Sequence, residues 1–414
     1  MSDRTTPAGD EPAALAPWLE GVRVLVCLGP GGVGKTTTAA AIAIAAARAG
    51  HRVAVLTVDP AARLKDALEL PERPGTLHRV PLPGDAEGSL DAVLLDAKGL
   101  FDGLVRRLAP IPDLAERIVL NPVYRNVAGA FAGSDAYMAL EQVLDLASGS
   151  DHDLVVVDTP PASHALELFD APQKILALLQ SRALEYLADP SRILGNATSR
   201  IARGVLSGVV MALERMTGLT LMRDLSALAS DFSEIAPRFR DRASGIRDLL
   251  HAPSTRYVLV TAPDPHGADD VLAFAGEVDR LGIRCDAVVV NRVLSFAERG
   301  GERPRRAGVA ARRERTGELP PALVRRLAEC ASDLEAIGTG QRRVIDRLRA
   351  GLDALDAARG GTSPRLWLEL PALRPPPVTL AAIADLACRL GTAAAPNTDP
   401  PAGDIPGRRT RGRR

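Results

Sequence analysis

Lysine, aromatic residues and cysteine are scarce in this chain of 414 residues. Aromatic residues make up 3% and hydrophobic residues 46%, so the core must consist of Ala, Val, Leu and Ile, which suits helices packed on a parallel sheet. The four cysteines form no CxxC pair and no Cys/His cluster at metal spacing, which argues against a zinc site and favours a reduced protein. Lysine occurs only four times, so a lysine within a motif is informative.

The chain also lacks a net charge, a long apolar run and an apolar start. Its 51 basic and 51 acidic residues cancel, so no global field favours nucleic acid or an anionic membrane. No stretch approaches the roughly 18 apolar residues of a membrane span, and the acidic, Pro-rich N-terminus does not fit a signal peptide. We therefore expect a cytoplasmic protein with no nucleic-acid partner and no stable membrane insertion.

Short apolar runs alternate with longer stretches of helical periodicity along most of the chain. The runs are rich in Val and Leu and lie at 22–28, 52–58, 90–96, 153–158, 257–262, 285–291 and 365–370. Buried strands separated by helices are typical of a parallel sheet that is covered on both faces. The sequence thus predicts an α/β fold over residues 21–392, with a doubly wound, mostly parallel sheet of about seven strands.

Four segments interrupt this alternation. Residues 173–250 are helical throughout, which predicts an inserted all-helical subdomain. Residues 296–316 are rich in Arg and Gly and are expected to form an exposed loop, with an anion-binding patch as the less favoured alternative. Residues 1–20 are rich in Pro and acidic side chains, and residues 393–414 are rich in Pro and Gly and end in an Arg cluster, so we expect both tails to be disordered.

The segment CLGPGGVGKTTTAAA at 27–41 contains the phosphate-loop pattern GxxxxGK(S/T). It follows an apolar strand and opens a predicted helix at Thr37–Gly50, a context that favours this motif over a simple Gly-rich turn. Glycines let the backbone wrap around phosphate oxygens, the lysine neutralises the β/γ charge, and the threonine hydroxyl can ligate Mg²⁺. The residues expected to bind nucleotide are Gly29, Gly31, Gly32, Val33, Gly34, Lys35, Thr36 and Thr37.

Two further strand ends carry carboxylates that fit the same site. The second predicted strand runs into Asp59 in TVDPAARLKDAL, and the fourth ends at Asp158 in DLVVVDTPPASH. An apolar run that closes on Asp is the Walker B pattern, in which the carboxylate holds Mg²⁺ directly or through water. A helix N-cap or turn residue is the alternative role, and for Asp59 taken alone it is the favoured one. Together with the loop, the carboxylates predict a site for a Mg²⁺-bound nucleoside triphosphate.

These motifs together resemble the ArsA-type ATPases, which include arsenical-pump-driving ATPases and targeting factors for tail-anchored membrane proteins. The resemblance rests on GGVGKTT, VDPA, DTPPASH, VVVNR and a Leu-Pro strand end near Pro371, in the order of the family, and covers about residues 20–392. It is closest to actinobacterial members, some of which occur as paired, non-identical subunits. The resemblance implies a dimeric P-loop ATPase that binds ATP and Mg²⁺.

The resemblance also implies roles for individual residues. Lys35, Asp59 and Asp158 would be catalytic: Asp59 would polarise the attacking water, and Asp158 would organise Mg²⁺ with Thr36. Asn291 would lie against the adenine base, with a strand-end turn residue as an equally favoured alternative. The residues expected to switch with the nucleotide state are Asp59, Pro60, Asp158, Thr159, Pro160 and His164.

Pro30 departs from the family pattern. At this position the family has a lysine that crosses a dimer interface to the phosphates bound by the partner, as an arginine finger does elsewhere. Proline has neither charge nor donor. The resemblance therefore implies that this chain binds ATP with Lys35 but hydrolyses it feebly until a homologous subunit provides the lysine. The alternative is that another basic residue, such as Arg63, replaces the missing charge.

Within the predicted insertion, apolar residues recur at helical spacing, and three of the five methionines of the chain lie there. A Met-lined face can accept varied apolar segments, and in the targeting relatives this insertion binds transmembrane helices. A hydrophobic client segment or membrane protein is therefore a candidate partner, although packing as core is the favoured alternative for most of this face. The candidate groove residues are Val205, Val209, Met211, Leu213, Met216 and Met222.

Three functions fit these observations. The first is an ATPase subunit that couples hydrolysis to movement of the helical subdomain, and the second is a nucleotide-binding regulatory subunit with little turnover of its own. The third is a partitioning ATPase of the ParA/MinD type. The C-terminal GRRTRGRR has no apolar face for a MinD-like membrane helix, and an Arg-rich tail alone is weak evidence for DNA binding.

Overall fold

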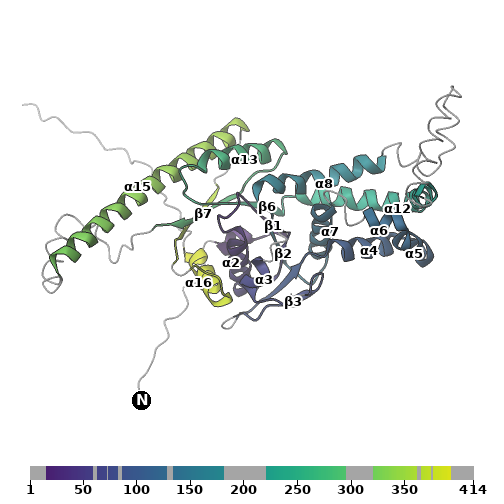
Figure 1. Ribbon diagram of the computed structural model, residues 1–414, viewed down its shortest axis with the longest axis horizontal. Coiled ribbons are helices and arrows are strands. Elements are labelled where there is room, and N and C mark those ends of the chain that lie inside the picture. Colours follow the sequence, from purple (N-terminus) through teal and green to yellow (C-terminus); the bar gives the residue numbers. More distant parts are fainter. Residues whose placement is uncertain are drawn as a thin grey trace, which may run out of the picture.

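An eight-stranded sheet lies at the centre of the computed structural model (Figure 1). The structure describes residues 15–58, 63–71, 73–82, 86–127, 134–180, 221–294, 320–360, 365–373 and 376–392. The strand order is β3-β4-β2-β5-β1-β6-β7-β8, and all neighbours pair in parallel except β3, which is antiparallel to β4. The strands are β1 (Val24–Leu28), β2 (Arg52–Thr57), β3 (Leu77–Arg79), β4 (Ser89–Leu94), β5 (Leu154–Asp158), β6 (Thr255–Thr261), β7 (Ala287–Val293) and β8 (Leu366–Pro371).

The predicted α/β class and mostly parallel sheet are confirmed, with three local differences. β3 was not predicted, because its three residues LHR are too few and too polar to form an apolar run. The run expected at 285–291 begins later, so Cys285 precedes β7. The helix after the loop begins at Lys35 rather than Thr37, because the end of the loop already forms its first turn: the Thr38 amide donates to the Gly34 carbonyl at 2.9 Å.

Burial on both faces explains the continuous apolar character of the central strands. All five residues of β1 and of β5 are buried. Successive side chains of a strand point to opposite faces, so Val24, Val26 and Leu28 join one hydrophobic core, while Leu25 and Cys27 join the other. Two cores separated by one sheet are typical of a doubly wound α/β domain.

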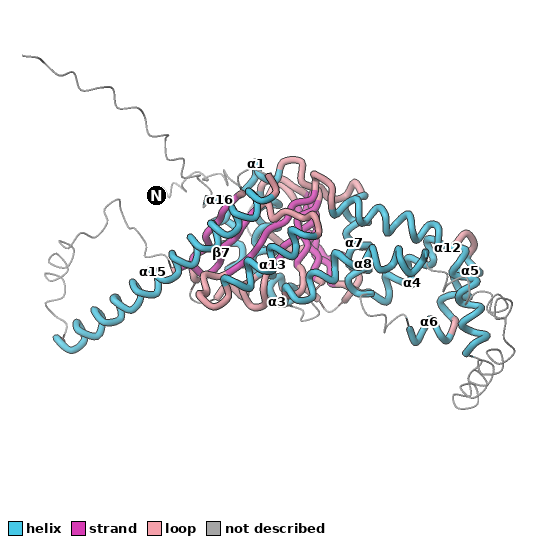
Figure 2. The backbone as a smooth tube through the Cα atoms, turned by 90° about the horizontal axis from the view of Figure 1, so that it is seen from above, coloured by secondary structure: helices cyan, strands magenta, loops and turns pink. Residues whose placement is uncertain are grey.

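Helices cover both faces of the sheet (Figure 2). The helices on one face are α1 (Leu15–Leu19), α2 (Lys35–Arg48), α3 (Arg63–Leu68) and α16 (Leu380–Thr392). On the other face, α13 (Ala268–Arg280) and α15 (Pro321–Ala358) pack beside each other. The sequence of α2, KTTTAAAIAIAAAR, consists mostly of small side chains, which allow a close approach to the sheet and to α16.

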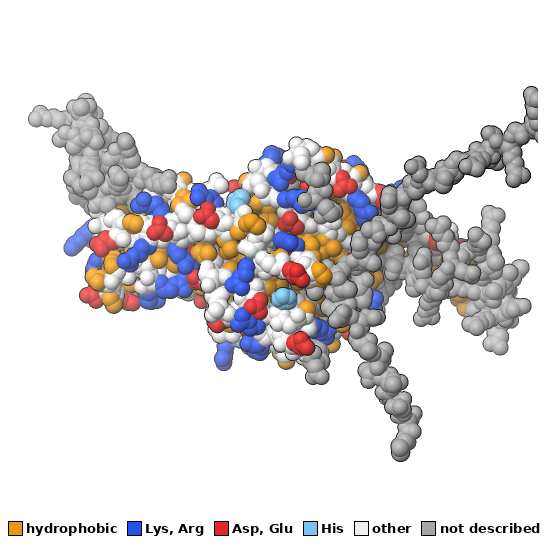
Figure 3. Space-filling model, turned by 180° about the vertical axis from the view of Figure 1, so that it is seen from behind, with side chains coloured by type: hydrophobic (Ala, Val, Ile, Leu, Met, Phe, Trp, Pro, Cys, Tyr) orange, Lys and Arg blue, Asp and Glu red, His pale blue; other side chains and the backbone are white. Residues whose placement is uncertain are grey.

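Six further helices extend from one end of the sheet and form what we call the helical region (Figure 1, right; Figure 3, left). They are α4 (Ala97–Leu108), α5 (Pro112–Leu120), α6 (Pro122–Val127), α7 (Ser134–Ser148), α8 (Ala162–Gln180) and α12 (Leu221–Leu250). Helix α12 packs on the other five. The insertion expected at 173–250 thus packs on helices that precede it in the chain, and its residues 181–220 lie outside the described residues, as do residues 296–316 and 393–414. The disorder predicted for residues 1–20 is wrong for the end of that segment: α1 buries Leu15 and Leu19 in the core beside α2 and α16, because this apolar pair at helical spacing packs on the domain.

Aromatic rings and charged side chains bind α12 to α7. Phe239 stacks on Tyr137 with ring centroids 5.5 Å apart. The Arg242 guanidinium donates to the buried Glu141 carboxylate at 2.8 Å and to Asp145 at 2.6 Å. The helical region is therefore held by packing and by a partly buried ion-pair network between segments about a hundred residues apart.

Candidate functional site

Glycines at two points give the loop between β1 and α2 its path. Gly29 has φ 144° and Gly34 has φ 97°, values that side-chain-bearing residues rarely adopt. A Cβ atom at Gly29 would collide with the Val260 carbonyl of β6, and one at Gly34 would collide with the Asn291 side chain of β7. The loop therefore lies against the ends of two neighbouring strands, at positions where only glycine fits.

Lys35 is buried within this loop. Its ammonium group donates to the carbonyl of Pro30 at 2.8 Å, so the lysine reaches back across the loop that precedes it. The N-cap residue of α2 is Gly34, and no side chain caps the helix. An uncapped helix N-terminus with a lysine beside it attracts an anion, because backbone N–H groups and the helix dipole favour negative charge there.

Asp158 ends β5 and is fully buried beside the loop. In the sheet register it is the partner of Cys27 in β1 and of Thr57 in β2, and the Thr57 hydroxyl donates to its Oδ2 at 3.1 Å. Burial above all, followed by the Asp158 carboxylate, raises the pKa of the Cys27 thiol, while Lys35 acts in the opposite direction. Lys35 and Asp158, the predicted Walker B carboxylate, thus both act on Cys27. Thr57 was not predicted as a site residue, although it ends β2, the strand next to β5.

The second predicted switch segment runs from Asp158 over the loop into α8. Thr159 is buried, and its hydroxyl donates to the Cys27 carbonyl at 2.6 Å. Pro161 lies 3.7 Å from where a Cβ atom of Gly31 would be. Pro160 lies between them, and His164 is exposed on the first turn of α8. This segment thus connects the end of β5, beneath the loop, to helix α8 of the helical region.

The first predicted switch lies outside the described residues, since these stop at Val58 and resume at Arg63. The Val58 amide donates to the Asp158 carbonyl at 3.0 Å, so the last described residue before this switch lies beside Asp158. Most of the predicted client groove is also outside the described residues, and Met222 lies in the first turn of α12.

Asn291 lies on β7 with both ends of its amide engaged. Its Nδ2 donates to the Val33 carbonyl at 2.9 Å, and its Oδ1 accepts the Arg292 amide at 2.9 Å. The Asn291 side chain therefore braces the phosphate loop. Arg292 itself has φ 63°, a conformation that is strained for a residue with a side chain.

A cavity of about 650 Å³ opens beside the end of the loop. It is walled by the loop, by the ends of β7 and β8 and by the segment that leads into α16, so its size and mixed lining suit the base and sugar of a nucleotide. Its far wall, from residues 371–373, 376–378 and Leu386, was not predicted as part of the site. The lining residues are Gly34, Thr37, Asn291, Arg292, Pro371, Ala372, Leu373, Pro376, Pro377, Val378 and Leu386.

Two other features of the described residues bear on ligands. They contain no group of three or more His, Cys, Asp or Glu side chains placed to hold a metal ion. Among the same residues, no helix has the length and apolar character needed to cross a membrane. Cys27 and Cys285 are buried, whereas Cys330 and Cys388 are exposed on separate helices.

Comparison with known proteins places the site within a family. The model of the family described as anion-transporting ATPase matches residues 22–307. The uncharacterized protein SCO2128 of Streptomyces coelicolor is 35% identical over 277 residues, which are 66% of this chain and 63% of that protein. The ATPase get3 of Aspergillus terreus is 28% identical over 278 residues, 66% of this chain and 74% of the relative. The ATPase ARSA2 of Chlamydomonas reinhardtii is 25% identical over 283 residues, 66% of this chain and 69% of the relative.

The family match spans the loop, Asp158 and Asn291, and it covers more than half of the chain. The resemblance predicted from the sequence motifs is therefore confirmed. The chain spans less than two thirds of the length of its Streptomyces relative. On this match and on a P-loop architecture with a mostly parallel sheet, the chain belongs to the family of anion-transporting, ArsA-type ATPases.

Proposed function

We propose that this chain is a Mg²⁺-dependent, ATP-hydrolysing subunit of an ArsA-type dimer, and that its turnover depends on a homologous subunit with a lysine where this chain has Pro30. The observation that carries the proposal is the make-up of the loop. Lys35 is buried inside it and, like Asp158, acts on the Cys27 thiol, whereas Pro30 contributes a carbonyl acceptor and no charge. The chain therefore has the groups that bind ATP and lacks the charge that would act on a partner.

The residues present fit a Mg²⁺-bound triphosphate. The loop backbone, whose path depends on Gly29 and Gly34, and the N-terminus of α2 would surround the phosphates, and Lys35 would exchange the Pro30 carbonyl for phosphate oxygens. Thr36 and Asp158 would hold Mg²⁺, which neutralises charge on the β- and γ-phosphates when bound. Asp59 would orient the attacking water. ATP and Mg²⁺ are accordingly the proposed cofactors.

The missing charge sets the expected rate. A cation placed across an interface against a transferring phosphoryl group is worth a factor of about 10³–10⁵ in rate, so the chain alone should turn over slowly. Gly31 and Gly32, next to Pro30, are exposed, so this part of the loop faces outward where a neighbouring subunit can reach it. The proposed assembly is therefore a heterodimer whose partner lysine completes the site of this chain.

Coupling to the helical region follows from the course of the second switch. Pro161 lies against the loop at Gly31, and α8 begins directly after it and packs on α12. A change at residues 158–164 with nucleotide state would therefore move α8 and the helices around it. We propose that a hydrophobic client segment or membrane protein binds to the helical region and responds to this movement.

A complementation experiment tests the missing lysine. The donor is a Pro30→Lys, Lys35→Ala double variant, which offers the crossing charge but has lost the lysine that binds ATP. Mixing it with the wild-type chain should raise ATP hydrolysis at least about tenfold above the sum of the two separate rates. A Pro30→Ala, Lys35→Ala double variant is the matched control and should give no gain. Equal rates with donor and control would contradict the proposal, as would fast turnover by the wild type alone.

Two substitutions separate the remaining alternatives. Arg63 begins α3 and is exposed, so if it replaced the missing lysine, Arg63→Ala would lower the basal rate of the wild type. We expect no such change. In the complemented mixture, Asp59→Asn in the wild-type chain should abolish the gain in rate. An unchanged rate would assign this chain a regulatory role instead.

A further inference from the structure

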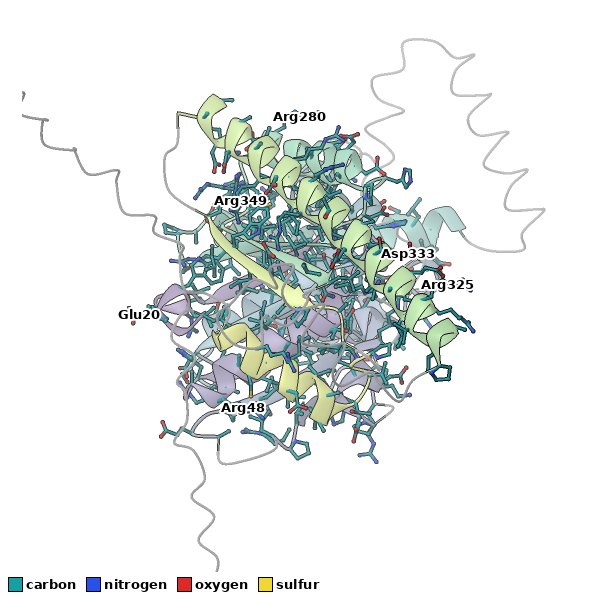
Figure 4. All side chains as sticks on the ribbon, turned by 90° about the vertical axis from the view of Figure 1, so that its left-hand side faces the viewer. Glu20, Arg48, Arg280, Arg325, Asp333 and Arg349 are labelled. Atoms are coloured by element: carbon teal, nitrogen blue, oxygen red, sulfur yellow. The ribbon has the colours of Figure 1, made fainter. Side chains whose placement is uncertain are left out.

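Helix α15 has two halves in different surroundings. Its C-terminal half packs on α13 and the core through Val344, Ile345, Leu348 and Leu352, all of which are buried. Its residues 322–337, which we call the arm, are exposed at every position. Figures 1 and 2 show the arm leaving the body at the end opposite the helical region, and Figure 4 labels Arg325 and Asp333 on it.

The arm carries an apolar seam. Leu323, Leu327, Cys330, Leu334 and Ile337 follow one another at intervals of four, three, four and three residues, which is the heptad pattern of a coiled coil. Leu327 is 52% exposed and Ile337 is 51% exposed. Five of the nine large hydrophobic residues that are exposed in the described chain lie on this arm, so the apolar surface is concentrated there rather than scattered.

The seam needs a partner for energetic reasons. A helix of this length is marginal alone in water, and most of the stability of a helix in a protein comes from packing of its apolar face. The same heptad spacing continues through positions 341, 344 and 348, where Val344 and Leu348 are buried against the body. The seam of the C-terminal half is thus covered by the body of the same chain. The seam of the arm is covered by nothing in the described residues.

Charged residues beside the seam indicate which helix packs against it. With Leu327 and Leu334 at heptad position a and Leu323 and Cys330 at d, the flanking g positions hold charges of opposite sign, Arg326 and Asp333. Two such helices that run in opposite directions bring their g positions together along one side. We propose that the arm pairs with the arm of a second copy of this chain as a short antiparallel coiled coil.

The side chains specify the register of this pair. Leu334 lies opposite Leu323 of the second copy, and Leu327 lies opposite Cys330, so two-fold symmetry gives four apolar layers. In this register Arg326 of each copy lies beside Asp333 of the other, which gives two ion pairs. On the other side the e positions bring Val324 beside Ala331.

Other arrangements use these charges less well. An antiparallel pair shifted by one heptad brings Asp333 against Asp333 of the second copy, which is repulsive. A parallel pair places Arg326 beside Ala331 and Asp333 beside Gly338, so neither charge has a partner. The antiparallel pair also leaves the two bodies at opposite ends, because each arm projects away from its own body.

Sedimentation velocity of the full chain without nucleotide tests the pairing by charge exchange. The wild type should show a concentration-dependent dimer. Arg326→Asp and Asp333→Arg should each raise the dissociation constant roughly tenfold, since each exchange replaces two attractive pairs by two repulsive ones. The double exchange should restore the wild-type value. Arg325→Asp is the matched control on the opposite face of the arm and should change nothing.

A substitution in the seam gives the complementary result. Leu334→Asp places a charge in two of the four layers and should leave only monomer, with circular dichroism and thermal unfolding of the body retained because Leu334 is exposed in the single chain. The dimer should also persist in Lys35→Ala, which separates this interface from the nucleotide site.

Several results would overturn the proposal. A wild type that stays monomeric at its highest soluble concentration would assign the seam to another occupant, such as residues 295–319 of the same chain or a different protein. A dimer that survives Leu334→Asp would lie elsewhere on the molecule. Failure of the double exchange to restore pairing would reject the antiparallel register, and oxidation of the dimer to a Cys330–Cys330 disulfide would indicate the parallel one.

Discussion

Lys35, at the carboxyl ends of the strands, and Glu141, in the helical region, are both charged side chains that the fold buries. Their exposed fractions are 7% and 2%. The ammonium of Lys35 donates to a neutral loop carbonyl, and this bond can be exchanged for one to a phosphate. The carboxylate of Glu141 instead accepts from Arg242 and from the Tyr137 hydroxyl, both from its own chain. The difference teaches that a buried charge held by a replaceable loop carbonyl suits a ligand, whereas one held by two side chains of its own chain serves as scaffold.

The largest effect on stability should come from breaking the scaffold. Arg242→Ala leaves the Glu141 carboxylate buried without its guanidinium, which should lower the free energy of unfolding by about 2–3 kcal/mol, somewhat less than for a fully buried pair because Arg242 is partly exposed. Urea unfolding measures this change, and ATP affinity should be retained. In the control, Arg242→Met with Glu141→Gln removes both charges, keeps an amide oxygen that accepts from Tyr137, and should destabilise less than Arg242→Ala. Weakened ATP binding in Arg242→Ala would contradict the assignment of Arg242 and Glu141 to the scaffold rather than to the nucleotide site.

A smaller effect, confined to the site, is expected at Asn291. Asn291→Ala removes the donor that holds the Val33 carbonyl, which should weaken ATP binding roughly tenfold and lower the free energy of unfolding by about 1 kcal/mol. Calorimetry with ATP and with GTP separates bracing from base recognition. If Asn291 acts as a brace, both affinities fall equally. A fall for ATP alone would show that the residue reads the base.

The phosphate loop could be predicted from the sequence, whereas the contacts of Asn291 and Glu141 could not, and the reason is physical. Gly29 to Thr37 are consecutive, and the Walker B aspartate ends an apolar run, so local patterns locate them. Asn291 and Val33 are 258 positions apart, and Glu141 and Arg242 are 101 apart, so their contacts depend on how separate segments pack. The sequence motifs suggested Asn291 only through the family resemblance, and they gave no indication of the Glu141 network.

The same reason explains what was missed elsewhere. Periodicity indicated helix over residues 173–250, but it could not show that α4 to α7 pack on α12. An amphipathic pattern shows that a helix face is buried and does not show which element buries it. β3 is held by pairing with β4 rather than by its own composition. The two halves of α15 share one heptad pattern, and only the fold separates the buried half from the exposed arm.

The smallest effect is expected at an exposed ion pair at the amino ends of β2 and β5, opposite the strand ends that carry the loop. Hydrogen bonds from the Arg52 side chain and then from its backbone lower the pKa of Asp153 to about 2. A carboxyl whose pKa is lowered by folding stabilises the fold above its unfolded pKa, and this contribution disappears as the pH falls toward 2. The Asp153 side chain is 37% exposed, so solvent screening should keep the loss in Asp153→Asn below about 1 kcal/mol at pH 7. The variant and wild type should converge in unfolding free energy near pH 2, and a difference that persists there would contradict the assignment.

The most direct test of the account is titration calorimetry of the full chain with Mg²⁺ and ATP, alongside Lys35→Ala. The account predicts that the wild type binds one ATP, that the variant binds roughly a hundredfold more weakly because it loses charge-assisted hydrogen bonds to phosphate, and that the two unfold at similar temperatures. No uptake of ATP by the wild type, or equal affinity in a folded Lys35→Ala variant, would contradict it.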